Sequence, residues 1–314
     1  MKKIISILFL ALFLASCGID KNINEVSQNT PKTQDVIAVT ASIIPLASVI
    51  NAIWWDYVDV NTIIPAGVSP HGFDLSAQDV VAIENSEIAF IIGLEQIDGF
   101  LEEVLEDKKH VELAQGIDLL EAEAHDHSDH EDEHDEHENE HNDHNVDAHV
   151  WLGEENIMEI AGKIRSELVA IMPEQANLFN ANTEIFIEQV NEIYEDFRET
   201  HNGKTAGEFI VFHDAYNYLM QSAGIDSDLK IPFSENVLHE SGTAHMAELI
   251  EEIELHGIKN VFSEPQFSDG NLQSFAQQYN LSIAILDPLG TDESAHWYLN
   301  NLKTNLDNIS IIYE

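Results

Sequence analysis

The sequence predicts an α/β protein built as two parallel-sheet, Rossmann-like lobes joined by a long rigid helix. Two observations carry this prediction. Short apolar runs of strand length alternate with amphipathic helical stretches along the chain from Val36 onward, which is typical of parallel sheets covered by helices. One uninterrupted helical pattern, Glu174 to about Thr200, separates two similar halves. The 314 residues and 44 % hydrophobic content are sufficient for two domains with real cores.

The N-terminus is typical of an export signal. Lys2 and Lys3 precede the apolar run Ile4–Leu14, which is too short to cross a bilayer, and small residues follow. The sequence Leu-Ala-Ser-Cys that ends at Cys17 resembles a bacterial lipobox, which implies cleavage before Cys17 and lipidation of that cysteine. We expect residues 1–17 to be a lipoprotein signal peptide and residues 18–34 a flexible tether, so that the folded part is extracytoplasmic and anchored to a bacterial membrane.

The first lobe is expected over residues 35–172. Val36–Thr40 has the composition of a buried strand, and Pro45–Ile53 that of a helix with proline in its first turn. Ser76 is a suitable N-cap for a helix over Ala77–Glu84. The other expected strands of this lobe are 57–64, 87–92 and 110–113, and the other expected helices are 96–106 and 154–171.

The connecting helix is expected within residues 173–202. Its apolar residues recur at helical spacing, and Gly203 ends the pattern. About 27 helical residues would span roughly 40 Å at 1.5 Å per residue, which is long for a crossover within one sheet. The apolar residues that set the spacing are Phe179, Phe186, Val190, Ile193 and Phe197.

The second lobe, over residues 203–314, repeats the alternation of the first. Gly224 and Gly257 follow two helical patterns and suit the ends of helices. The expected strands are 209–212, 229–231, 260–263 and 281–286. The expected helices are 215–223, 243–256 and 271–279, with a last helix that begins near Asp292 and runs towards Ile309.

A tract from Glu121 to His144 interrupts the first lobe and consists almost entirely of His, Asp and Glu. Short His-rich tracts are typical of metal binding, and imidazole suits zinc, copper, iron and nickel. A tract of acidic residues alone would indicate only a solvated loop, but the histidines favour an accessory metal-binding loop over residues 121–145. These histidines are His125, His127, His130, His134, His137, His141 and His144.

The net charge of −45 argues against nucleic acid as a partner, because phosphate binding needs Lys and Arg and the chain has only 13 of them. It suits metal cations. The single cysteine excludes an intrachain disulfide, although exported proteins often carry them. Phosphate-binding glycine loops and a Gly-x-Ser-x-Gly nucleophile elbow are absent from the sequence.

Four polar side chains follow either a predicted strand or the His-rich tract. These are His71, His149, His213 and Asp287. Ligands of such folds bind beyond the carboxyl ends of the strands, so we expect the four to face one cleft between the lobes. Three imidazoles and a carboxylate form a four-coordinate set that zinc accepts.

Asp147, Asp214 and Glu264 are expected to support this set. Asp147 and Asp214 lie beside His149 and His213, where they could orient the imidazoles, although each could equally cap a turn.

The motifs around these residues resemble those of zinc-binding substrate-binding proteins of bacterial ABC importers, the ZnuA/TroA type. The resemblance covers nearly the whole chain after the tether. It rests on Pro-Ala-Gly-Val-Ser-Pro-His ending at His71, Asp-Ala-His-Val-Trp-Leu around His149, Phe-His-Asp-Ala-Tyr around His213, Phe-Ser-Glu-Pro-Gln-Phe around Glu264, and Leu-Asp-Pro-Leu-Gly around Asp287.

This resemblance implies a carrier that is not an enzyme. It implies that Zn(II) is held between two lobes by His71, His149 and His213, with Asp287 or a water as the fourth ligand, and delivered to a membrane permease. Zinc members of the family also carry an acidic His-rich loop in the first lobe. Manganese members tend to carry Glu where His213 stands. Ala148 departs from the proline of the family motif, which should alter loop stiffness more than ligation.

The residues leave other functions open. A surface lipoprotein that buffers metal or acts as an adhesin would have the same composition, and a manganese carrier would have a similar fold. A zinc hydrolase would need an open ligand position for water, and the general base it needs has no clear candidate except Glu264. The His-rich tract could collect zinc near the cleft or sense excess metal. We expect a monomer.

Overall fold

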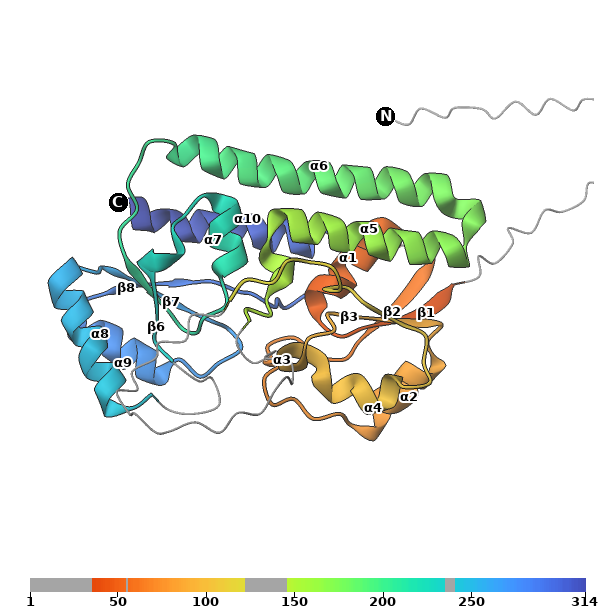
Figure 1. The fold of residues 1–314 in the computed structure, drawn as a ribbon, viewed down its shortest axis with the longest axis horizontal. Helices are drawn as coiled ribbons and strands as arrows, with labels where there is room; N and C mark the ends of the chain where they lie inside the picture. Colours follow the sequence, from red (N-terminus) through yellow and green to blue (C-terminus); the bar gives the residue numbers. More distant parts are fainter. Residues whose placement is uncertain (1–35, 55, 122–145, 235–240) are drawn as a thin grey trace, which may run out of the picture. The chain divides into compact units, whose positions relative to one another are not determined.

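The computed structural model describes residues 36–54, 56–121, 146–234 and 241–314. Val36–Glu314 forms one compact unit that contains two four-stranded parallel sheets (Figure 1). The predictions for Cys17, the tether and the His-rich tract fall outside the described residues and stay predictions. Within the described ranges, every helix is too short or too polar to cross a membrane.

The first sheet has the strand order β2-β1-β3-β4, and all neighbouring strands are parallel. Its strands are β1 Ile37–Ala41, β2 Val58–Thr62, β3 Ile88–Ile91 and β4 His110–Glu112. Its principal helices are α1 Ile44–Trp54, α2 Ala77–Asn85 and α5 Glu154–Ile171. Ser76 caps α2 in a capping box with Asp79, as the sequence predicts for that residue.

The second sheet repeats this topology with the order β6-β5-β7-β8, again parallel throughout. Its strands are β5 Phe209–Val211, β6 Lys230–Pro232, β7 Asn260–Ser263 and β8 Ser282–Ile285. Its helices are α7 Asn217–Ala223, α8 Thr243–His256, α9 Gly270–Tyr279 and α10 Trp297–Ile309. The predicted α/β class with two parallel-sheet lobes is therefore confirmed.

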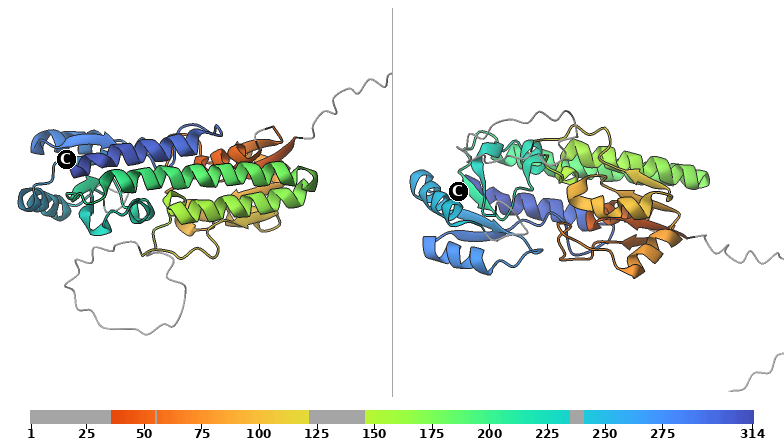
Figure 2. Two further views of the ribbon diagram at one scale, coloured as in Figure 1. Left: turned by 90° about the horizontal axis from the view of Figure 1, so that it is seen from above. Right: turned by 60° about the horizontal axis from the view of Figure 1, so that its bottom comes forward.

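The long helix α6, Ala176–His201, follows the 3-10 turn Pro173–Gln175 and runs along both lobes (Figures 1 and 2). It contacts α1 and α5 beside the first sheet and α7 beside the second. Its apolar stripe is buried: Phe179 stacks on Trp54 of α1 with ring centroids 4.1 Å apart. The predicted connector is confirmed as a single helix of 26 residues.

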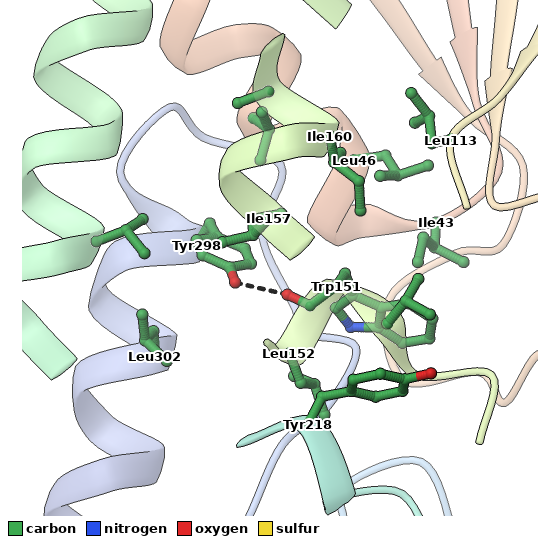
Figure 3. Packing of buried hydrophobic residues seen from close by; sticks show 14 of the residues in the cluster. Ile43, Leu46, Leu113, Trp151, Leu152, Ile157, Ile160, Tyr218, Tyr298 and Leu302 are labelled. Atoms are coloured by element: carbon green, nitrogen blue, oxygen red, sulfur yellow. Dashed lines mark hydrogen bonds between the residues drawn. The ribbon is translucent and has the colours of Figure 1, made fainter. Parts of the chain in front are cut away.

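The two lobes share one hydrophobic core around Trp151 (Figure 3). Trp151 lies in the 3-10 turn Val150–Leu152, and its indole Nε1 donates to the carbonyl of Pro288 at 2.7 Å. Tyr298 of α10 donates to the carbonyl of Trp151 at 2.6 Å. A chain segment next to His149 is thus fixed by groups from the second half of the sequence.

Two predicted helices differ from the structure. The expected helix 96–106 is broken into α3 Glu95–Asp98, a 3-10 turn and α4 Glu102–Leu105, because Asp98 has non-helical backbone angles and turns its carboxylate to the backbone N–H of Ile92 and Gly93. The last helix begins at Trp297 rather than near Asp292, whose carboxylate accepts from the N–H of Ser294 in a turn.

Candidate metal centre

Three of the predicted ligands meet at the carboxyl ends of the two sheets. His71 lies in the loop between β2 and α2, His149 precedes the turn Val150–Leu152, and His213 follows β5. One nitrogen of each ring lies within 4.8 Å of the others, and the ring centroids are 5.1 to 5.8 Å apart. The structure therefore brings together imidazoles that are far apart in the sequence.

The loop that carries His71 is shaped by two tight turns. Val68 donates to the carbonyl of Pro65, and Gly67 takes a φ of +74°, which strains any residue with a Cβ. The N–H of His71 donates to Oγ of Ser69 at 3.2 Å. These contacts lie within the loop itself, so the loop geometry is largely local.

Carboxylates hold the other two rings through Nδ1. Nδ1 of His149 lies 2.8 Å from Oδ1 of Asp147, and Nδ1 of His213 lies 2.7 Å from Oε1 of Glu264. A carboxylate only accepts hydrogen bonds, so each Nδ1 carries the proton and donates it. This is the usual support of a metal-ligating histidine, and it directs the ligand nitrogen Nε2 away from the carboxylate.

The Nε2 atoms face one another. Nε2 of His149 lies 3.3 Å from Nε2 of His213, and Nε2 of His71 is buried without a hydrogen-bond partner among the described residues. With the Nδ1 protons donated to carboxylates, neutral rings would oppose two lone pairs across this gap. A shared proton or a cation resolves that repulsion.

A zinc ion fits the spacing. Two nitrogens bound at about 2.0–2.1 Å in tetrahedral geometry are about 3.3–3.4 Å apart. The observed Nε2–Nε2 distance of 3.3 Å has that value. His149 and His213 therefore have the Nε2 separation and the free lone pairs that a tetrahedral metal site requires, and a nitrogen of His71 lies within 4.8 Å of both.

His71 and His213 differ electrostatically. Burial, with the charges of His149 and His213, lowers the pKa of His71 to about 3. Burial would also lower the pKa of His213, but the charge and hydrogen bond of Glu264 outweigh it and raise that pKa above its ordinary value. Asp147 is fully buried, yet its bonds to His149 keep its pKa below the usual range.

The structure does not bring Asp287 into the three-histidine group. Its Oδ1 instead accepts from Nε2 of Gln266 at 2.7 Å and from the N–H groups of Leu289 and Gly290 at 3.2 and 2.7 Å. Asp287 is 9 % exposed and anchors the loop after β8. These bonds occupy Oδ1, so Oδ2 is the atom through which Asp287 could approach a metal.

The expected role of Asp214 beside His213 is wrong. Its Oδ1 accepts from Nζ of Lys230 and from Nδ2 of Asn217, the latter at 3.2 Å, whereas Glu264 takes the Nδ1 proton of His213. Asp214 is drawn to the buried ammonium rather than to the imidazole. Sequence reasoning missed Lys230, although a lysine inside a predicted strand was a usable signal.

A second group of potential ligands lies elsewhere on the second lobe and contains Glu208, Glu252 and His256. Nδ1 of His256 lies 2.7 Å from Glu208, and Nε2 lies 3.3 Å from Glu252. One ion binds only one nitrogen of an imidazole. Because each nitrogen faces a different carboxylate, this arrangement is that of a bridging ion pair.

Comparisons with known proteins identify the family of this chain. A family model described as zinc-uptake complex component A, periplasmic, matches residues 39–311. The high-affinity zinc uptake system protein ZnuA of Haemophilus influenzae is 30 % identical over 290 residues, with 80 % of this chain and 85 % of that protein covered. The manganese-binding lipoprotein MntA of Halalkalibacterium halodurans is 24 % identical, with 96 % and 94 % covered.

The same fold occurs in a crystal structure of ZnuA, with a TM-score of 0.75, 24 % identity, and 89 % of this chain and 100 % of that chain covered. The family match extends over both sheets, the connecting helix and all three histidines. This chain belongs to the ZnuA family of periplasmic zinc-uptake components.

Proposed function

We propose that this protein captures Zn(II) between its two lobes and hands it to the permease of an ABC importer. The observation that carries the proposal is the convergence of three imidazoles, two of them with Nε2 atoms 3.3 Å apart and Nδ1 atoms held by buried carboxylates. That arrangement costs electrostatic repulsion unless a cation or proton occupies it, and zinc matches its spacing. His71, His149 and His213 are the proposed ligands.

Asp287 is the proposed fourth ligand, through Oδ2. Its Oδ1 is bonded to Gln266 and to two backbone N–H groups, so Oδ2 is the oxygen left to bind the metal. A set of four protein ligands leaves no position for a reactive water. A closed site of that kind suits a protein that carries the ion and does not hydrolyse a substrate.

Zinc is favoured over manganese by the donor atoms. Three imidazole nitrogens suit zinc, whereas carboxylate and carbonyl oxygens suit manganese. The relative MntA is named for manganese, so a manganese carrier is the alternative that must be tested.

Two further parts belong to the proposal and rest on the sequence. Cleavage before Cys17 and its lipidation would anchor the carrier, as a monomer, beside the permease. The histidines of the tract 121–145 would bind zinc weakly and raise its concentration near the cleft.

The experiment is a competitive titration of the chain from Val36 onward with Zn(II) and Mn(II) against a chelator of known affinity. It is run beside His213→Ala and beside His245→Ala, a histidine of α8 outside the metal group. We expect one tight zinc site that His213→Ala abolishes and His245→Ala retains. Equal loss in both variants, or tighter binding of manganese than of zinc, would refute the proposal.

A further inference from the structure

Lys230 is a buried cation that the proposed zinc chemistry does not use. Its side chain in β6 is 0 % exposed, and among the buried residues of the described ranges it is the one lysine or arginine. Lysine is almost never fully buried unless it is paired, because an ammonium loses its hydration. Its partner is Asp214, the residue after the proposed ligand His213.

A chain of hydrogen bonds leads from Lys230 to a second proposed ligand. Oδ1 of Asp214 accepts from Lys230 and also from Nδ2 of Asn217. The backbone N–H of Asn217 donates to Oδ2 of Asp147 at 3.3 Å, and Oδ1 of Asp147 accepts from both the backbone N–H and Nδ1 of His149. Both carboxylate oxygens of Asp147 therefore accept hydrogen bonds, Oδ2 from Asn217 and Oδ1 from His149.

This series of hydrogen bonds crosses from the second lobe to the first. Lys230 lies in β6, Asp214 in the loop between β5 and α7, and Asn217 at the start of α7, whereas Asp147 precedes His149 in the first lobe. The position of α7 thus decides whether Asp147 keeps its second partner. An Asp147 held on both sides can present only one orientation to the imidazole.

We propose that Lys230 is a positioning residue of the metal centre, which acts through Asp214 and Asn217 to fix Asp147 and thereby keep Nε2 of His149 free for zinc. The inference rests on the proposed zinc function. It means that the contact between the lobes and the affinity for zinc are coupled, because movement of α7 away from Asp147 removes support from His149.

The test replaces Lys230 by methionine in the chain from Val36 onward, the compact unit described above. Lys163→Met is the control, since the ammonium of Lys163 donates to the backbone carbonyls of Leu113 and Gln115 and takes no part in the hydrogen bonds that link Lys230 to His149. Two quantities are measured: the zinc affinity by chelator competition, and the tautomer of His149 in the metal-free protein from its imidazole ¹⁵N shifts, assigned by comparison with His149→Asn.

We expect Lys230→Met to weaken zinc binding about tenfold, the lower end of the effect of residues that support metal ligands. We also expect part of the His149 population to move its proton from Nδ1 to Nε2. Lys163→Met should leave both quantities unchanged. A purely structural role for Lys230 would lower stability and leave the tautomer alone.

Two further variants cover the case in which Lys230→Met does not fold. Asp214→Asn combined with Lys230→Met removes both buried charges together, and Asn217→Ala cuts the side-chain link while both charges remain. Each should shift the tautomer in the same direction. If the variants that fold keep the zinc affinity and the His149 tautomer of the unmodified protein, the inference about Lys230 is overturned, and the proposed zinc function is not affected. Absence of tight zinc binding in the unmodified chain would overturn the proposed function and this inference with it.

Discussion

Nε2 of His149 and Nε2 of His213 lie 3.3 Å apart, and Nδ1 of each ring donates a hydrogen bond to a buried carboxylate. The two atoms approach closely although the residues belong to different lobes and are 64 positions apart in the sequence. Only a proton or a metal ion between them makes this contact favourable. Zinc and protons should therefore compete for one place.

That competition predicts a definite pH dependence of zinc binding. The pKa of His213 is raised, so on acidification this ring takes up a proton earlier than a free histidine would, and the proton must leave before zinc binds. His71, with a pKa of about 3, stays neutral at mildly acidic pH and releases no proton. Below the pKa of His213, that ring should contribute about a tenfold loss of apparent affinity for each pH unit.

The measurement is the zinc dissociation constant between about pH 5 and pH 8, with a chelator whose own protonation is known. The His71 prediction is checked by ¹H–¹⁵N spectra of the metal-free protein, in which His71 should stay neutral at about pH 5. An affinity that does not change over this range, or a His71 that titrates near its ordinary value, would contradict the electrostatic description.

Glu264→Gln should weaken zinc binding while the fold is preserved. Glutamine keeps the shape of the side chain and an oxygen acceptor for Nδ1 of His213, but it removes the charge that makes this imidazole a better ligand. We expect about a tenfold loss of affinity. Glu208→Gln on the same lobe is the control, because Glu208 pairs with His256 and not with a proposed ligand. Equal affinities in the two variants would argue against this support.

Deletion of residues 122–145 should leave the tight site intact. The residues at its two ends already meet, since Glu121 pairs with Val146 in an antiparallel bridge and the N–H of Asp147 donates to the carbonyl of Leu120 at 2.9 Å. A short turn can therefore join them without moving Asp147. Calorimetric titration should lose the weak zinc sites and keep one tight site; loss of the tight site would show that the tract supplies ligands to it.

Tyr298→Phe should lower the stability of the protein. The hydroxyl of Tyr298 is buried and donates to the carbonyl of Trp151, so its removal leaves that carbonyl without this donor. The expected cost is about 1–3 kcal/mol in the free energy of unfolding, measured with urea on metal-free protein. The control is Tyr279→Phe, whose hydroxyl accepts an exposed hydrogen bond from Gln278 and which should change stability by less than about 0.5 kcal/mol.

The periodic part of the fold could be predicted from the sequence because it depends on local patterns. The helices Glu154–Ile171 and Thr243–His256 and the strand Asn260–Ser263 have the predicted bounds, since proline, glycine or a change of period marks each end. The break in the expected helix 96–106 could not be predicted, because it arises from hydrogen bonds between the Asp98 carboxylate and backbone N–H groups just after β3.

The three histidines of the site could also be predicted, whereas most of the contacts around them could not. Two of the histidines, His71 and His213, follow predicted strands, and His149 follows the His-rich tract. The parallel topology therefore brings all three to the carboxyl ends of the sheets. The contact of Asp147 with His149 is local and was expected, but the partners of the other three carboxylates depend on long-range packing and were not predictable. Asp214 pairs with Lys230, Glu264 with His213, and Oδ1 of Asp287 with Gln266.

The most direct test of the three-histidine site is zinc K-edge X-ray absorption on the 1:1 zinc complex of the chain from Val36 onward without residues 122–145. Removal of the tract ensures that its histidines do not contribute to the signal. We predict about three imidazole nitrogens and one oxygen at about 2.0–2.1 Å, with the multiple scattering that imidazole rings produce. A first shell of oxygen atoms with one imidazole or none would contradict the account.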